Sequence, residues 1–235
     1  MAALIGNAGA CSAGRVQLGR RWLVGTDMND RAEHPQVRTC VEPERTALIL
    51  IDVINDMQVD GESERFARDA LDAAHRIKAL KSQAKAACIP VIYANDNFGQ
   101  WRSDFAGVIR HCTADDAPGK PVSELLHPED DDYFVLKPRH SGFFGTTLQI
   151  LLRHLDRDTL ILAGFAADVC VLFTAHDAYM REFGLFVPCD CVASVDAEAN
   201  ERALTLMSRV VKADIRPSDE LKFEAVSGGP PTGFS

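Results

Sequence analysis

Basic residues are in short supply in this chain of 235 residues. It carries 25 lysines and arginines against 34 aspartates and glutamates, which gives a net charge of −9 at pH 7. A protein of this charge repels phosphate backbones and anionic lipid headgroups, so nucleic acid and membrane surfaces are not expected partners. No apolar stretch is long enough to cross a bilayer either.

The seven cysteines lack the paired C-x-x-C spacing of a structural zinc site. Residues 1–27 also lack the positively charged start and the apolar centre of a secretion signal. An odd number of cysteines without such a signal indicates a reducing compartment, so we expect a cytoplasmic protein. Cys189 and Cys191 stand two apart in a strand-like run, where their side chains would share one face.

Both ends of the chain differ in composition from its middle. We expect a flexible extension over residues 1–40, within which Met28 is an alternative start, and a tail over residues 221–235 that is rich in glycine and proline. The part between them, residues 41–220, is long enough to form one domain with a single hydrophobic core.

This middle part alternates between strand and helix patterns. Short apolar runs predict strands buried on both faces, and apolar stripes at helical spacing predict helices. A long connection without a predicted element follows residue 94. The expected strands cover residues 46–51, 89–94, 133–137, 159–163, 185–193 and 213–215, and the expected helices cover 63–87, 146–154, 171–183 and 197–211. The alternation predicts a Rossmann-like α/β fold: a single doubly wound domain with about six mostly parallel strands and helices on both faces.

Three polar residues stand where predicted strands end. Asp52 and Lys137 end the first and third strands, and Cys170 follows the fourth. Taken singly, each has an ordinary structural explanation as a turn residue, a surface lysine or a small buried side chain. The carboxyl ends of parallel strands meet at one edge, however, so we expect the three side chains to converge there.

Cys170 also precedes a predicted helix over residues 171–183. Unpaired N–H groups and the helix dipole favour a thiolate at a helix N-terminus. We therefore expect a lowered pKa and a reactive sulfur at Cys170.

The segments around these three residues resemble the isochorismatase-like cysteine hydrolases, a family that includes nicotinamidases and N-carbamoylsarcosine amidohydrolases. The matching segments read ALILIDVINDM (residues 47–57), KPRHSGFFGTT (137–147) and GFAADVCV (164–171), and the resemblance covers roughly residues 44–215. Together, in this order and at strand ends, they form a specific signal.

The resemblance implies that Asp52, Lys137 and Cys170 are catalytic, with Cys170 forming a thioester. It further implies a cis peptide bond at Phe165–Ala166 and an oxyanion hole made by the backbone N–H groups of Ala166 and Cys170. The chain departs from the family at Ala167, where a threonine is usual. The family also suggests a homo-oligomer.

Nicotinamidases of the family carry a D-x-H metal site after the second strand. Here Asp96 is present, but Phe98 stands two residues later. We therefore expect no metal, no cofactor and a substrate other than nicotinamide, with a hard cation near Asp96 as the alternative.

Aromatic and polar side chains gather in residues 93–105 and in the segment after Lys137, as in a small-molecule pocket. Burial between subunits is the alternative explanation for the aromatic ones. We expect His140 to contact the substrate rather than to act as the base. The candidate substrate-binding residues are Asn95, Phe98, Trp101, Arg102 and Phe143.

The predicted function is hydrolysis of a small amide or related C–N bond. One alternative is isochorismatase activity, which hydrolyses a vinyl ether and gives pyruvate. The other is a thiol-reactive binding or sensor protein without enzymatic activity on the same fold.

Overall fold

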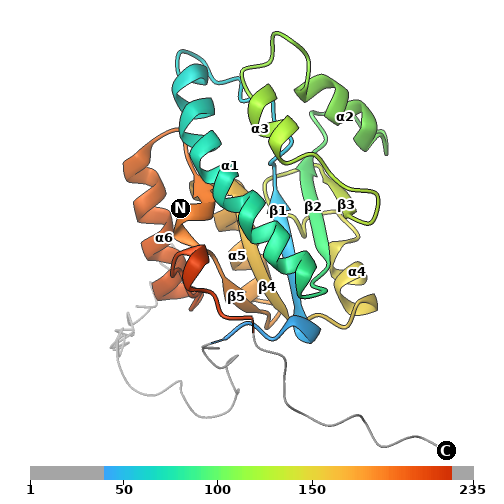
Figure 1. Ribbon diagram of the computed structural model, residues 1–235, viewed down its shortest axis with the longest axis vertical. Helices are drawn as coiled ribbons and strands as arrows, with labels where there is room; N and C mark the ends of the chain where they lie inside the picture. Colours follow the sequence, from blue (N-terminus) through green and yellow to red (C-terminus); the bar gives the residue numbers. More distant parts are fainter. Residues whose placement is uncertain (1–39, 224–235) are drawn as a thin grey trace, which may run out of the picture. The chain divides into compact units, whose positions relative to one another are not determined.

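The structure is a computed structural model that describes residues 40–223 (Figure 1). Within these residues a six-stranded parallel sheet has the order β3-β2-β1-β4-β5, and the short β6 pairs with β4. The strand order reverses between β1 and β4. The strands are β1 (Thr46–Ile51), β2 (Val91–Asp96), β3 (Tyr133–Lys137), β4 (Thr159–Phe165), β5 (Gly184–Phe186) and β6 (Val192–Ala193).

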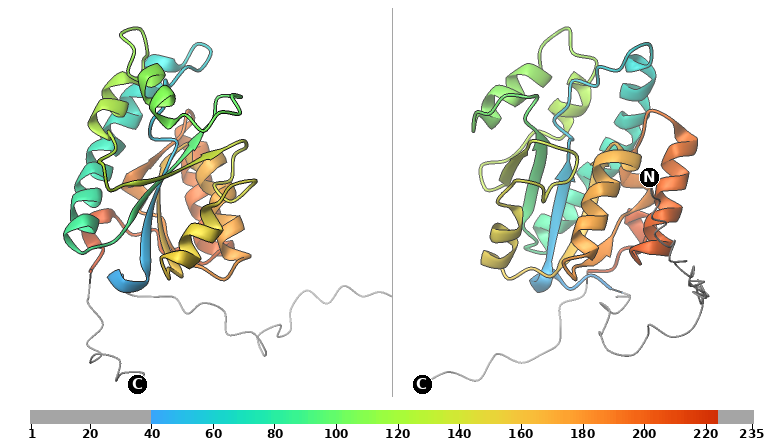
Figure 2. Two further views of the ribbon diagram at one scale, coloured as in Figure 1. Left: turned by 90° about the vertical axis from the view of Figure 1, so that its right-hand side faces the viewer. Right: turned by 180° about the vertical axis from the view of Figure 1, so that it is seen from behind.

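Helices cover both faces of the sheet, as the doubly wound prediction requires. The helices are α1 (Ser63–Ala86), α2 (Phe105–Cys112), α3 (Lys120–Leu125), α4 (Leu148–His154), α5 (Leu172–Tyr179) and α6 (Ala197–Val210). Helices α1, α2 and α3 lie on one face, and α4, α5 and α6 lie on the other (Figures 1 and 2). None of the helices among the described residues combines the length and the apolar character needed to cross a membrane.

The central strand β1 is apolar at almost every position because both of its faces are covered. Leu48 and Leu50 pack into the core beneath α1, whereas Ala47, Ile49 and Ile51 pack into the core beneath α4, α5 and α6. Successive side chains of a strand point to opposite faces, so a strand covered on both sides needs an apolar residue at every position.

The predicted strand over residues 185–193 is interrupted and forms only β5 and β6 at its two ends, and the predicted strand over 213–215 is wrong. Strand β5 ends at Phe186, a 3₁₀ turn follows at Cys189–Cys191, and Asp214 forms only an isolated bridge with Phe186. Pro188 precedes the turn, and proline supplies no N–H for a sheet. Cys191 is consequently buried while Cys189 is half-buried, so the two side chains do not share a strand face.

The long connection after β2 contains two short helices that the sequence analysis missed. Asp104 accepts a hydrogen bond from the N–H of Gly107 at the start of α2, and Pro121 stands in the first turn of α3. Both are recognised helix-start signals. Their helices are too short to show a clear apolar period, and the start signals alone were not enough to predict them.

Described residues beyond the predicted boundary at residue 220 still pack against the domain. Leu221 is buried, and Phe223 forms a parallel bridge with Val41. Residues 1–39 of the predicted extension and residues 224–235 of the predicted tail lie outside the described residues.

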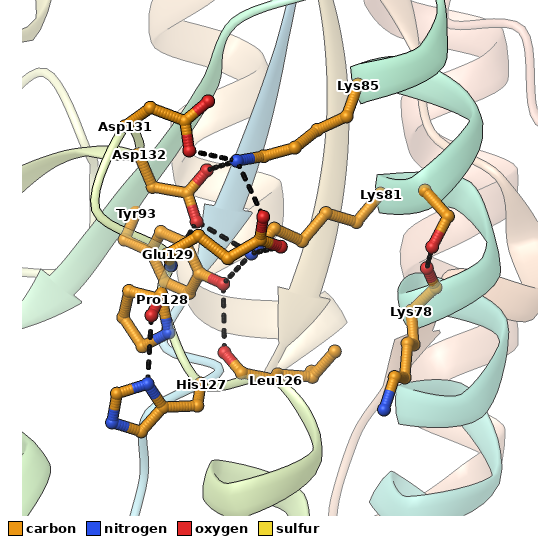
Figure 3. A network of polar contacts seen from close by, with 11 residues as sticks. Lys78, Lys81, Lys85, Tyr93, Leu126, His127, Pro128, Glu129, Asp131 and Asp132 are labelled. Carbon is orange, nitrogen blue, oxygen red and sulfur yellow. Dashed lines mark hydrogen bonds and ion pairs between the residues drawn. The ribbon is translucent and has the colours of Figure 1, made fainter.

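A network of polar contacts fastens α1 to the segment that leads into β3 (Figure 3). The buried Lys81 donates to Asp132 at 2.6 Å and to the hydroxyl of Tyr93 at 3.1 Å. Tyr93 in turn donates to the carbonyl of Leu126 at 2.9 Å, and Lys85 lies 2.9 Å from the other Asp132 oxygen. Asp132 immediately precedes β3, so these contacts fix the start of the strand that ends in Lys137.

Candidate active site

Asp52 directly follows β1 and leaves the strand in a left-handed conformation with φ 50°. Aspartate tolerates this conformation better than most residues. Its N–H donates to the carbonyl of Ala94 at 3.1 Å, and its Oδ1 accepts from the N–H of Asp96 at 2.6 Å. Two bonds to the neighbouring strand β2 thus set the direction of the carboxylate.

Lys137 ends β3 in register with Asp96 of β2. Its Nζ lies 2.7 Å from Oδ2 of Asp52 and 3.9 Å from Oδ2 of Asp96, and its side chain is 0% exposed. A buried ammonium is tolerable only with such partners. The sequence-based alternative of a surface lysine is therefore wrong.

Cys170 follows β4, beside the point where the strand order reverses. The peptide bond Phe165–Ala166 is cis, as the family resemblance implied. Gly164 has φ 126°, and a Cβ there would collide with the carbonyl oxygen of Ile51. Glycine is thus required where β4 approaches β1. One π-helical turn (Ala167–Val171) then carries the cysteine and leads into α5.

The sulfur of Cys170 lies among three polar side chains. Lys137 Nζ is 3.5 Å from Sγ, and His140 Nδ1 is 3.9 Å from it. Asp52 is close enough to contribute to the raised pKa of the thiol. The structure therefore brings Asp52, Lys137 and Cys170 together at the carboxyl edge of the sheet and adds His140 to them.

The expected low pKa of Cys170 is wrong. Burial, followed by repulsion from Asp52, raises the pKa of this thiol to about 12 and outweighs the opposite effect of Lys137. In addition, Cys170 lies inside the π-helical turn rather than at the first free N–H group of a helix.

The other two groups differ in what controls their pKa. Burial raises the pKa of Asp52, although Lys137 opposes the shift. Burial would lower the pKa of Lys137, but attraction to Asp52, Cys170 and Asp96 outweighs it and raises this pKa. Burial thus makes Asp52 a stronger base, while its neighbours keep Lys137 charged.

Two hydrogen-bond chains that sequence reasoning missed hold the cysteine turn in place. The N–H of Asp168 donates to Ser194 Oγ at 3.2 Å, and Ser194 donates to Asn200 Oδ1 of α6 at 3.3 Å. Thr174 donates to the carbonyl of Cys170 at 2.7 Å and accepts from the N–H of Gly142 at 3.0 Å. These chains join strands, helices and loops far apart in the sequence, so no local pattern indicates them.

The family resemblance implied an oxyanion hole at Ala166 and Cys170. Ala166 directly precedes the π-helical turn, and Cys170 is the second-to-last residue of the turn. Both are half-buried. The carbonyl of Ala166 accepts the N–H groups of Val169 and Val171 at 3.2 and 3.1 Å, which fixes the orientation of the Ala166–Ala167 peptide. Ala167 is fully buried in the apolar core, where its methyl group needs no polar partner.

A cavity of about 510 Å³ opens where β2 and β3 end, lined by Asp96 and by residues that follow Lys137 in the chain. It combines two aromatic side chains, a guanidinium, a carboxylate and an amide, the mixture expected of a small-molecule pocket. Trp101 is the predicted substrate contact that lines it. The lining residues are Asp96, Asn97, Gly99, Trp101, Pro138, Arg139 and Phe144.

The other predicted substrate contacts do not line this cavity. Phe98 and Arg102 line a separate hollow of about 110 Å³ that includes His111. Asn95 is buried and donates to the carbonyl of Ile54 at 2.5 Å, while its Oδ1 has no hydrogen-bond partner among the described residues.

Phe143 requires a correction as a substrate contact. It is 6% exposed, and its ring packs on Phe183 and beneath the guanidinium of Arg181. Its neighbour Phe144 is 59% exposed and lines the cavity instead. Both residues belong to an irregular segment, so no periodicity indicated which ring faces the core.

Among the described residues, no three His, Cys, Asp or Glu side chains are grouped as metal ligands. The Asp96 carboxylate accepts the N–H of Phe98 at 2.6 Å through Oδ1, while Oδ2 faces Lys137. A carboxylate next to a buried ammonium is a poor ligand for a cation, because the two positive charges repel each other.

Comparison with known proteins gives a consistent picture. The isochorismatase domain family matches residues 46–215. An uncharacterized isochorismatase family protein, YaaI of Bacillus subtilis, is 39% identical over 175 residues, which cover 74% of this chain and 95% of the relative. The isochorismatase of the same organism is 30% identical over a match that covers 75% of this chain and 58% of that protein. The crystal structure of N-carbamoylsarcosine amidase from Thermoplasma acidophilum has a TM-score of 0.57 and 29% identity, with 75% of this chain and 98% of that chain covered.

Proposed function

This chain belongs to the isochorismatase family of hydrolases, and we propose that it cleaves a small amide or related C–N bond through a thioester on Cys170, without a metal ion. The observation that carries this proposal is the position of Lys137 Nζ, 2.7 Å from the Asp52 carboxylate and 3.5 Å from the sulfur of Cys170. The buried ammonium of Lys137 thus lies next to both the proposed acid–base group, Asp52, and the proposed nucleophile, Cys170.

The first half of the reaction uses Asp52 as the base. The carboxylate accepts the thiol proton as sulfur bonds to the amide carbon, and the burial that raises its pKa makes it a stronger base. The N–H groups of Ala166 and Cys170 stabilise the oxyanion, and loss of either donor would cost about 3 kcal/mol of transition-state stabilisation. The C–N bond then breaks, Asp52 returns the proton to the leaving amine, and the acyl group remains on sulfur.

The raised pKa of Cys170 determines when the thiolate forms. Since the thiol is the stable form at neutral pH, its deprotonation accompanies attack on the substrate instead of preceding it. The ammonium of Lys137 stabilises the negative charge while it is on sulfur. This arrangement protects the free enzyme from unwanted alkylation and oxidation, because the thiolate is the reactive form.

Metal independence is supported by the surroundings of Asp96. Phe98 stands where the nicotinamidase pattern has a histidine. The backbone N–H of Phe98 donates a hydrogen bond to one oxygen of the Asp96 carboxylate. Lys137 supplies a positive charge on the other side. Asp96 is thus a partner of the lysine, and nicotinamide is not the proposed substrate.

A second candidate function is isochorismatase activity. Similarity to a Bacillus subtilis isochorismatase favours it, and vinyl ether hydrolysis needs an acid–base group such as Asp52. That reaction makes no use of a nucleophilic sulfur. Because the ammonium of Lys137 contacts both the sulfur of Cys170 and the Asp52 carboxylate, and because a similar solved structure is an amidase, C–N cleavage is the first choice.

A substrate screen separates these possibilities. Small primary amides, ureas and ureido acids, together with isochorismate, are incubated with the protein while ammonia, pyruvate and a thioester adduct are monitored. The proposal predicts ammonia and a trapped adduct on Cys170, both absent in the Cys170→Ala variant. Pyruvate from isochorismate that survives in Cys170→Ala identifies the second candidate. Stoichiometric modification of Cys170 without any turnover indicates a thiol-reactive sensor instead.

A further inference from the structure

The peptide group between Cys170 and Val171 is held from both sides. The carbonyl of Cys170 accepts the hydroxyl of Thr174 at 2.7 Å. The N–H of Val171, which belongs to the same peptide, donates to the carbonyl of Ala166 at 3.1 Å. Because the side chain of Cys170 is attached next to this peptide, the two bonds also fix the direction in which the sulfur points.

Thr174 has a second partner in a distant part of the chain. A threonine in a helix often donates to the carbonyl four residues earlier, and that bond alone needs no functional explanation. Here the same oxygen also accepts the N–H of Gly142 at 3.0 Å. Thr174 is 0% exposed and Gly142 is buried, so water does not replace either bond. The packing at this point is close, since a Cβ on Gly142 would lie 3.3 Å from a methyl group of Leu148.

Gly142 belongs to the segment that follows β3 and forms one wall of the cavity. Arg139 and Phe144 of this segment line the cavity, and His140 Nδ1 lies 3.9 Å from the sulfur of Cys170. The hydroxyl of Thr174 therefore joins the peptide of the nucleophile to the wall against which a bound substrate would lie. A displacement of about 1 Å at a reacting group can lower a rate about 100-fold, so such a link affects the reaction.

We propose that Thr174 is a positioning residue, which holds the sulfur of Cys170 in a fixed position relative to the cavity wall for attack on a bound acyl group. Its hydroxyl acts through the Cys170 carbonyl and the Gly142 N–H and takes no part in proton transfer. Without the hydroxyl, both backbone groups lose this partner, and the cysteine turn is no longer bonded to the segment after β3. This inference rests on the proposed thioester mechanism.

Three variants separate positioning from general stability. Thr174→Val keeps the shape of the side chain but removes the hydroxyl, and Thr174→Ser keeps the hydroxyl. Thr46→Val is the matched control, because Thr46 is also 0% exposed and donates at 2.7 Å to the carbonyl four residues earlier, at the opposite end of β1 from Asp52. Thr174→Ala replaces Thr174→Val in the test if the valine prevents folding.

Two reactions of Cys170 provide the readouts. p-Nitrophenyl acetate transfers an acetyl group to a reactive cysteine, and stopped-flow absorbance of p-nitrophenolate measures this acylation as a first phase. Iodoacetamide labelling measures alkylation, which needs an accessible thiolate but no alignment with an oxyanion hole. Urea unfolding compares the stability of all variants.

Thr174→Val is expected to slow the first phase about 100-fold, while the rate of Cys170 alkylation changes far less. Thr174→Ser restores the first phase, and Thr46→Val loses stability but acylates as the unchanged protein does.

An unchanged first phase in Thr174→Val overturns the role of Thr174, as does an equal slowing in Thr46→Val or a failure of Thr174→Ser to restore the rate. Much faster alkylation in Thr174→Val overturns it too, because local unfolding of the turn would expose the thiol. Absence of a Cys170-dependent first phase in the unchanged protein overturns the thioester mechanism itself.

Discussion

Lys137 Nζ lies 2.7 Å from Asp52 Oδ2 although their strands, β3 and β1, are not neighbours in the sheet. The lysine reaches across the end of β2, where the N–H of Asp96 donates to the same carboxylate. Three consecutive strand ends are thus joined at Asp52. The contact therefore organises the site and also contributes to the stability of the sheet edge.

The first prediction concerns the stability of this buried pair. Lys137→Met leaves the Asp52 carboxylate without its counter-charge, and Asp52→Asn leaves the ammonium with only the more distant carboxylate of Asp96. Each variant is expected to lose about 3–5 kcal/mol of unfolding free energy, because one buried charge then lacks its nearest partner. The double variant is expected to lose clearly less than the sum of the two. Urea unfolding measures all four proteins, and strictly additive losses would contradict a direct pair.

The second prediction concerns the pH dependence of Cys170 alkylation. Because burial and Asp52 raise the pKa of this thiol to about 12, the thiol form dominates throughout the neutral range. The thiolate fraction, and with it the alkylation rate, is expected to rise about tenfold per pH unit between pH 7 and pH 9.

Iodoacetamide labelling followed by mass spectrometry of the Cys170 peptide measures this rate. Cys88, which is exposed just after α1, provides an internal reference in the same digest. A plateau of the Cys170 rate at neutral pH would show a lowered pKa and refute the electrostatic assignment.

The third prediction compares two adjacent phenylalanines. Phe143→Ala removes a buried ring and is expected to cost about 3–5 kcal/mol of stability. Phe144→Ala is expected to change stability by less than about 0.5 kcal/mol, because this ring is exposed in the cavity. Phe144→Ala should instead raise KM for the substrate found in the screen. Thermal unfolding and steady-state kinetics test the pair, and equal stability losses would mean that both rings belong to the core.

The fourth prediction tests the network that anchors the start of β3. Lys81 is buried against Asp132, whereas Lys78 on the same helix is exposed. Lys81→Met leaves Asp132 without its nearest charge and is expected to cost about 3–5 kcal/mol, while Lys78→Met should stay within about 0.5 kcal/mol. Chemical unfolding measures both variants. A neutral Lys81→Met would show that Lys85 alone suffices for Asp132.

The sequence by itself determined the framework. Continuous apolar runs specify strands buried on both faces, and β1 and β3 begin and end where these runs predict. Parallel strands place their carboxyl ends along one edge, so Asp52, Lys137 and Cys170 were expected to meet. The motifs around them pointed to the family. The expected cytoplasmic location and homo-oligomer stay predictions.

Only the tertiary structure decided the chemistry within that framework. Whether Cys170 rests as thiol or thiolate depends on its burial and on its distances to Asp52 and Lys137. Whether Phe143 or Phe144 faces the cavity depends on Phe183 and on other side chains far along the chain. Local patterns record which residues alternate between solvent and core, whereas charge interactions and packing depend on separations in space that no short stretch of sequence contains.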